Sequence, residues 1–282
     1  MQGQDVSAGL YRKPEILNRQ RHGSLRYDPR RDGFRFAAQV NSVPLATAEY
    51  DAAAAFFPLL FARNAEGGVF TLALLGLRSG ENLFVTDDGQ WDAGYLPAFI
   101  RRYPFAMARD GARLGVCIDA ASPELGLHSG EPLFTGGGAN TPLTDGVVRF
   151  LAELQQALDD SRRFHEQLAG LGLLEDVAVQ VTGGTEPQTL GGLMAVDENR
   201  VRALPPGTQD ALASSGAMRL IQIHLLSLAT LDGLTLRLAR RRDAAAQATG
   251  RATSQATQQG TPRAMPPAPP PHHQTTLQGT AS

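Results

Sequence analysis

One aromatic segment contains the side chains best suited to recognise a ligand. The sequence WDAGYLPAFIRRYPF, residues 91–105, places aromatic rings around two adjacent arginines. Guanidinium groups flanked by aromatic rings can bind a peptide, a carboxylate or a carbohydrate. Tyr95, Phe99 and Arg102 follow at i, i+4 and i+7, so in a helix they share one face. We name this set the Arg–aromatic block and predict that it binds a ligand: Trp91, Tyr95, Phe99, Arg101, Arg102 and Tyr103.

The same pattern has a purely structural interpretation. A short helix can dock its aromatic rings on a sheet while neighbouring arginines cap it or extend their stems along apolar surface. The choice of arginine at a given position does not by itself indicate a ligand-binding role. Lys13 is the only lysine among 26 basic residues, and GC-rich codon usage explains that bias. The structural and the binding interpretations both stay open at this point.

Residues of the types used in catalysis are not spaced for a known reaction. The sequence lacks GxSxG, and Ser-Xaa-Xaa-Lys is excluded because the lysine is at position 13. The pairs Asp87-Asp88 and Asp159-Asp160 fall in a turn and on an exposed helix face, so neither forms an acid–base dyad. The glycine clusters lack the spacing of phosphate-binding loops. We therefore predict no catalytic residue and favour a protein that is not an enzyme.

The histidines and the cysteine do not form a metal motif. His128 lies near Glu124 and Glu131, where it could ligate a metal or simply be solvated. His165 and His224 fall in apolar helical stretches, which favours a buried neutral imidazole over a proton shuttle. Cys117, in LGVCID, is more typical of a buried small side chain than of a nucleophile. We predict no metal site and no cofactor.

Composition excludes several classes of partner. The net charge of -2 does not favour binding to nucleic acid or to an anionic membrane. The longest apolar-rich run, residues 217–231, is interrupted by Arg219, Gln222, His224 and Ser227, so it predicts a buried helix and not a membrane span. The first residues lack the apolar core of a Sec signal peptide, which predicts a cytoplasmic protein.

The period of the apolar residues changes halfway along the chain. Strands are predicted at 34–38, from 43, at 56–62 with Pro58 at an edge or bulge, at 69–77 and at 82–85. Residues 95–102 predict a short helix, and Asp110-Gly111 predicts a hairpin between FAMA and RLGVCI. After a glycine-rich connection, a helical stripe runs from Val147 to Leu168. A second hairpin follows at 177–182 and 189–196, and further helices at 208–215 and 217–241.

These elements predict an α+β fold. A mostly antiparallel, bent sheet from the N-terminal half would be packed against helices from the C-terminal half. We predict a flexible N-terminus at 1–12 and a single domain at 13–242, strand-rich over 34–120 and helix-rich over 145–242. Residues 243–282 consist mainly of Ala, Gln, Thr, Pro and Gly, which predicts a disordered tail.

The Arg–aromatic block and several other segments resemble the bacterial SapC family. The matching segments are YRKPEILNRQRH (11–22), NSVPL (41–45), ALLGLRSGENLFV (73–85), GYLPAFIRRYPF (94–105), CID (117–119), GEPLF (130–134) and HLLSLA (224–229). They follow the family order and span about residues 11–241. Small departures occur at 135–144, where the family commonly has charged residues, and at the insertion-like Asp232-Gly233.

The resemblance implies a role but no chemistry. The family is associated with a paracrystalline bacterial surface layer, and other members look like companions of outer-membrane receptor systems. The first hypothesis is therefore a non-enzymatic interaction protein with a protein partner or self-association, exported to the cell surface by a non-Sec route. The alternative is a cytoplasmic accessory of an outer-membrane receptor system that binds a peptide or small molecule, and whether it is also an enzyme stays open. No catalytic residue is carried over from the family.

Overall fold

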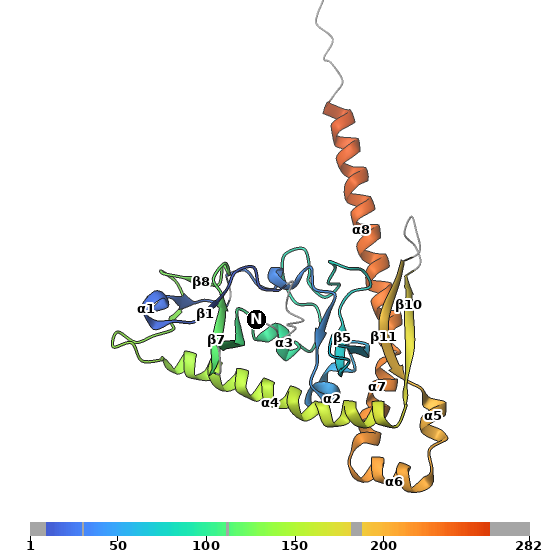
Figure 1. The fold of residues 1–282 in the computed structure, drawn as a ribbon. Coiled ribbons are helices and arrows are strands. Elements are labelled where there is room, and N and C mark those ends of the chain that lie inside the picture. The colour runs from blue at the N-terminus through green and yellow to red at the C-terminus, as the bar shows by residue number, and fades with distance from the viewer. Residues whose placement is uncertain (1–9, 30, 111–112, 182–187, 260–282) are drawn as a thin grey trace, which may run out of the picture. The chain divides into compact units, whose positions relative to one another are not determined.

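The computed structural model describes residues 10–29, 31–110, 113–181 and 188–259 and has an α+β fold (Figure 1). The chain divides into two compact units, one ending at Arg240 and the other beginning at Arg241. The strands and the apolar core belong to the first unit, so the description below concerns that unit unless stated otherwise.

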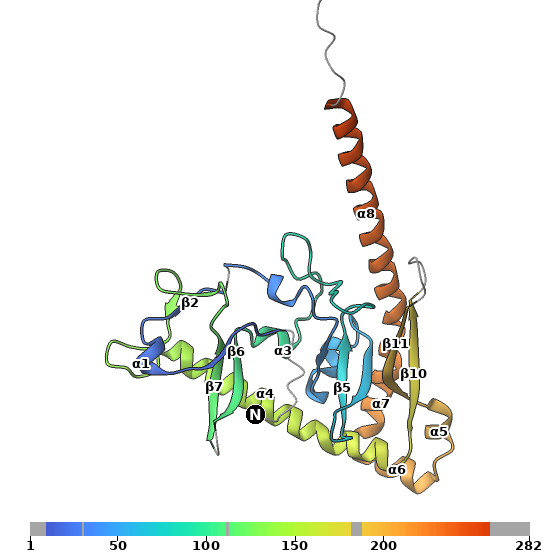
Figure 2. The same cartoon turned by 45° about the horizontal axis from the view of Figure 1, so that its top comes forward.

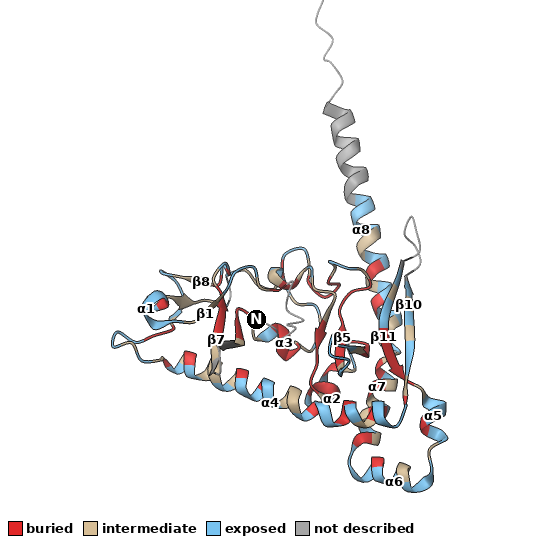
Figure 3. Cartoon of the chain, in the orientation of Figure 1, coloured by how far each residue is buried: buried red, intermediate tan, exposed pale blue. Residues whose placement is uncertain are grey.

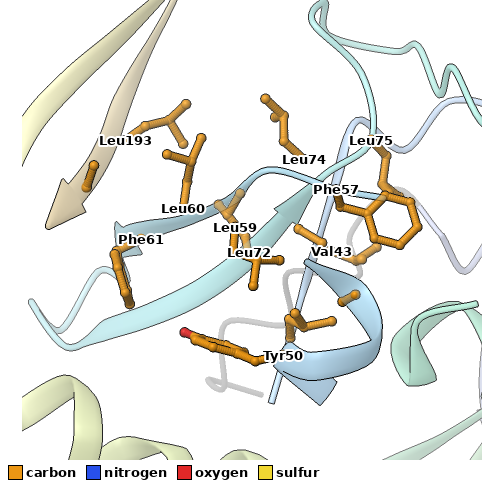
Figure 4. Close-up of a cluster of buried hydrophobic side chains, with 14 of the residues drawn as sticks. Val43, Tyr50, Phe57, Leu59, Leu60, Phe61, Leu72, Leu74, Leu75 and Leu193 are labelled. Carbon is orange, nitrogen blue, oxygen red and sulfur yellow. The ribbon is translucent and has the colours of Figure 1, made fainter. Parts of the chain in front are cut away.

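The main sheet has five antiparallel strands. They are β3 (Ser42–Pro44), β4 (Leu59–Arg63), β5 (Val69–Leu74), β10 (Leu174–Val181) and β11 (Gln188–Val196), in the order β10-β11-β4-β5-β3. The β10–β11 hairpin therefore joins the sheet of the N-terminal half through the pairing of β11 with β4. Figure 4 shows the apolar side chains of these strands packed together with Tyr50 and Phe57.

The described residues also form two smaller sheets (Figure 2). One contains β1 (Pro14–Ile16), β7 (Arg113–Asp119) and β6 (Phe105–Asp110), with β7 in the middle. The β6–β7 pair is the predicted hairpin, and its turn residues 111–112 lie outside the described residues. The other sheet contains the short strands β8 (Leu125–Gly126), β2 (Arg26–Tyr27) and β9 (Glu131–Pro132).

Three long helices follow from amphipathic patterns. Helix α4 (Pro142–Gly170) begins at the cap Thr141, whose hydroxyl accepts from Thr144 N, and it buries the predicted stripe including Leu151, Ser161 and His165. Helix α7 (Ala217–Ser227) and helix α8 (Thr230–Gln259) replace the single helix predicted at 217–241. The remaining helical segments are α1 (Arg19–His22), η1 (Arg35–Ala37), η2 (Thr47–Glu49), α2 (Tyr50–Ala53), α3 (Ala98–Arg101), α5 (Glu198–Arg202) and α6 (Pro206–Ser214).

Several local predictions are wrong. Residues 34–38 form the 3-10 turn η1 and not a strand, because the chain makes i to i+3 bonds there from Ala37 N to Phe34 O and from Ala38 N to Arg35 O. Pro58 does not mark an edge strand, because strand β4 is central, between β11 and β5. Pro58 precedes β4, so its missing N–H does not interrupt the hydrogen bonds between these strands. The predicted strand at 82–85 is reduced to the isolated bridge Val85–Trp91.

Packed or helical residues also lie outside the predicted domain bounds. Leu10 is buried, and Tyr11 donates through its hydroxyl to Phe105 O at 2.7 Å, so both residues contact the rest of the first unit. At the other end, the helical backbone of α8 continues through Gln259, beyond Asp243 where the disordered tail was predicted to begin. The rest of that tail, residues 260–282, lies outside the described residues.

Candidate functional site

A buried carboxylate determines where the helix of the Arg–aromatic block begins. Glu49 Oε1 accepts from Ala98 N at 2.8 Å, which caps the first turn of α3, and from the Tyr95 hydroxyl at 2.8 Å. Its other oxygen accepts from Ala46 N at 3.3 Å. Glu49 is 8 % exposed, so its charge is stabilised by these donors in place of water. The hydroxyl of Tyr95 is therefore occupied within the fold.

The indole of Trp91 packs inside the protein as well. Its Nε1 donates to Tyr95 O at 2.8 Å. The ring centroid lies 5.8 Å from that of Phe34 and 6.0 Å from that of Phe84. Trp91 thus fixes the loop before α3 against the core, with part of the side chain left accessible.

A second buried carboxylate holds the other end of the block. Asp119 Oδ2 accepts from the Tyr103 hydroxyl at 2.9 Å, and Asp119 also accepts from the backbone amides of Arg12, Lys13 and Ala121. Burial alone would raise the pKa of Asp119, but these donors hold the pKa below its usual value. The Tyr103 ring stacks on Phe36 with centroids 3.9 Å apart.

Arg101 is the outward-facing part of the block, whereas two guanidinium nitrogens of Arg102 are buried. The guanidinium carbon of Arg102 lies 3.6 Å from the ring centroid of Phe99, and that of Arg101 lies 5.0 Å from the ring centroid of Phe150 on α4. Arg101 is exposed and Arg102 is half-buried. The structure thus brings the six residues into one region but divides them between a packed interior and a small cation–aromatic surface.

A second surface was missed by sequence reasoning. An open, mainly apolar groove of about 370 Å³ lies between α2 and α7, and we name it the α2–α7 groove. Leu226 in this groove is 74 % exposed. At its border Arg219 Nη2 pairs with Asp51 Oδ1 at 2.6 Å. The groove is lined by Asp51, Ala54, Ala55, Ile223, Leu226 and Thr230.

One sequence signal could have indicated this groove. The buried positions of α7 are Ala217, Ile221, His224 and Ser227, and this spacing leaves Leu226 on another face. An apolar side chain on the face opposite a buried stripe is typical of a contact surface. The α2 side of the groove, about 170 residues away in the chain, could not be found in this way.

The histidines on the buried faces of α4 and α7 belong to the core. His224 Nδ1 lies 2.8 Å from Leu59 O, and its Nε2 accepts from Val196 N at 3.0 Å. His165 Nε2 lies 2.8 Å from Thr71 Oγ1, which in turn contacts the Tyr50 hydroxyl at 2.5 Å. Burial lowers the pKa of both His165 and His224 to about 4. Both imidazoles are therefore neutral near pH 7.

Within the residues that the structure describes, no cluster of three or more His, Cys, Asp or Glu side chains is arranged to hold a metal ion. The predicted ligand candidate Glu124 is buried near Asp28 and Asp32, and burial raises its pKa to about 8. In the same part of the chain, no helix combines the length and the apolar character needed to cross a membrane.

Comparisons with known proteins identify a family but no relative of known structure. The model of the family described as SapC matches residues 17–234. No curated protein matches the chain, and no solved structure matches it either.

Proposed function

The chain belongs to the SapC family, and from this membership we propose that it is a non-enzymatic interaction protein associated with the bacterial surface layer. The family match covers the region that contains both the Arg–aromatic block and the α2–α7 groove. In this proposal the protein is exported by a non-Sec route and binds a protein partner.

The exposed side chain of Leu226 is the observation that supports binding to a protein. At 74 % exposure, this leucine packs against little of its own chain, while Ala54, Ala55 and Ile223 form an apolar floor beside it. Burying a leucine against a partner contributes about 2 kcal/mol. The Asp51–Arg219 pair supplies a polar border of the kind found around interface cores.

Cell-surface location is tested by treating intact native cells with a protease and following the protein by immunoblot. Loss of the protein from intact cells supports surface exposure. Full protection, with recovery in the soluble cytosol, would contradict the surface-layer role. Lysed cells treated in the same way provide the control that the protein is cleavable.

The groove is tested by photo-crosslinking in native cells from a probe placed at residue 222, which is exposed on α7. We expect one discrete crosslinked product that disappears in the variant Leu226→Ser. The matched control is Leu236→Ser, because Leu236 is also exposed but lies on α8 outside the groove. A product that persists in Leu226→Ser would contradict binding at the groove.

The exposed Arg101 favours a second function, a cytoplasmic accessory that binds a carboxylate-bearing peptide or small molecule. The guanidinium carbon of Arg101 already lies 5.0 Å from the ring centroid of Phe150, so its position is restricted before a ligand arrives. Binding of carboxylate-terminated peptides, measured by calorimetry, should weaken about tenfold in Arg101→Ala. It should be unchanged in Arg149→Ala, an exposed arginine on α4.

A further inference from the structure

The outer edge of the main sheet is formed by β10. This eight-residue strand pairs with β11 on one side and is the terminal strand of the order β10-β11-β4-β5-β3. Figure 1 shows β10 at the border of the sheet, and Figure 3 shows most of it exposed. A long edge strand presents backbone donors and acceptors to any strand that can align with them.

One contact shows which backbone groups point outward. Leu174 O accepts from Arg200 Nη1 at 3.0 Å, on the side away from β11. Leu173 O points the other way, since it accepts from Asp197 N at 2.8 Å, next to the end of β11. These directions alternate along a strand, so the N–H and C=O groups of Asp176 also point outward. The β10–β11 register shifts between Val177 and Val179, but the extra residue there belongs to β11, so β10 keeps its alternation and Ala178 and Gln180 point outward as well.

Two two-fold registers use all three of these residues, one centred on Val177 and one on Ala178, and only the second sets Asp176 opposite Gln180. An antiparallel pair of β10 strands centred on Ala178 places Asp176 of one copy opposite Gln180 of the other, twice. The exposed amide of Gln180 can then donate to the exposed carboxylate of Asp176. Asp176 and Gln180 are therefore complementary partners across this two-fold axis.

Neighbouring registers are less favourable. Centring on Asp176 sets two carboxylates opposite each other, and like charges in that position repel. Centring on Val177 sets Leu174 against Gln180, although Leu174 O already accepts from Arg200. Centring on Val179 pairs only Ala178 and Gln180 among the outward-facing residues of β10.

We propose that two copies of this chain associate through their β10 strands, antiparallel and centred on Ala178, so that one sheet continues through both copies. The interface is isologous, and the Asp176–Gln180 pairs set its register. This surface is distinct from the α2–α7 groove, so the two proposals can fail separately.

The mass of the full chain in solution, measured by light scattering over a concentration series, tests this proposal. We expect a species of twice 30.1 kDa at the higher concentrations. Gln180→Asp should weaken the dimer about tenfold or more, because each interface then contains two carboxylate pairs. Gln180→Lys should leave the dimer as strong as in the parent or strengthen it, since lysine opposite Asp176 is attractive.

Two further variants keep the test decisive. Ala178→Pro removes an outward N–H without removing a bond to β11, so it should yield a monomer with unchanged circular dichroism. Gln155→Asp, on the exposed face of α4, is the control for added charge and should leave the mass unchanged. A parent that is monomeric at every concentration, or a dimer that survives both Gln180→Asp and Ala178→Pro, would overturn the proposal. A dimer lost in Leu226→Ser but kept in Gln180→Asp would also overturn it.

Discussion

At the scale of single residues, His224 and His165 make folding sensitive to acid. Val196 N donates to His224 Nε2, so that nitrogen carries no proton and Nδ1 donates to Leu59 O. His165 packs its ring against Phe61 with centroids 6.0 Å apart, and its Nδ1 is buried with no hydrogen-bond partner. Protonation would place a charge on a buried ring whose contacts, such as Phe61 and Thr71 for His165, are neutral.

We expect the free energy of unfolding to fall as the pH drops from about 6.5 to about 4. The folded pKa of each histidine is about 4, below the ordinary value of 6.5, so the unfolded chain takes up protons first. The loss is on the order of 3 kcal/mol for each histidine and is complete below pH 4. Urea unfolding at a series of pH values measures it.

Variants separate this effect from general destabilisation. His224→Asn should be less stable at pH 7, because it loses two buried hydrogen bonds, yet its stability should depend less steeply on pH. Asn82→Ala is the control, since Asn82 is fully buried but does not titrate, and its pH dependence should match that of the parent. Equal slopes in the parent and in His224→Asn would contradict the assignment.

At the scale of elements, the carboxylate of Glu49 links η2 to α3. In Glu49→Gln the remaining oxygen can still accept from Tyr95 and Ala98. The NH2 group then faces the N–H of Ala46, so two donors meet where a hydrogen bond was. We expect a loss of about 1–3 kcal/mol in the free energy of unfolding. Glu153→Gln, on the exposed face of α4, should change stability by less than about 0.5 kcal/mol. Chemical denaturation of both variants is the measurement.

Elements with a strong local pattern could be predicted, and those decided by distant contacts could not. Strand β5, the β6–β7 and β10–β11 hairpins and α4 follow from periodicity and turn residues within each segment. The break between α7 and α8 at Leu228-Ala229 carries no glycine or proline, so no local signal marks it. The pairing of β11 with β4 joins residues about 130 positions apart, and no pattern within either strand indicates the partner.

The candidate site shows the same division. Sequence reasoning placed six residues of the Arg–aromatic block in one region because they are contiguous. It could not show that Tyr95 and Tyr103 donate to Glu49 and Asp119, which come from other segments. That difference decides which side chain remains available to a ligand, namely the exposed guanidinium group of Arg101.

At the scale of the whole molecule, stability is concentrated in the first compact unit. Among the residues whose burial is described, the last core side chain is Leu238, two residues before that unit ends. We expect a chain truncated after residue 247 to melt within about 2 °C of the full chain, because about 1 kcal/mol corresponds to 2–4 °C in a domain of this size. Calorimetry of the two chains measures the difference. A drop of more than several degrees would show that the segment beyond residue 247 contributes to folding.

The contact of Arg237 with the Trp91 loop gives the protein an internal optical reporter. Arg237 on α8 donates to Asp92 O at 2.9 Å and lies over the Phe84 ring, which stacks against the indole of Trp91. Trp91 is the only tryptophan in the chain, so all indole emission comes from this place. Release of the first turns of α8 would admit water to the ring and shift the emission to longer wavelength. Fluorescence of the unlabelled protein can therefore follow the docking of the first turns of α8 in real time.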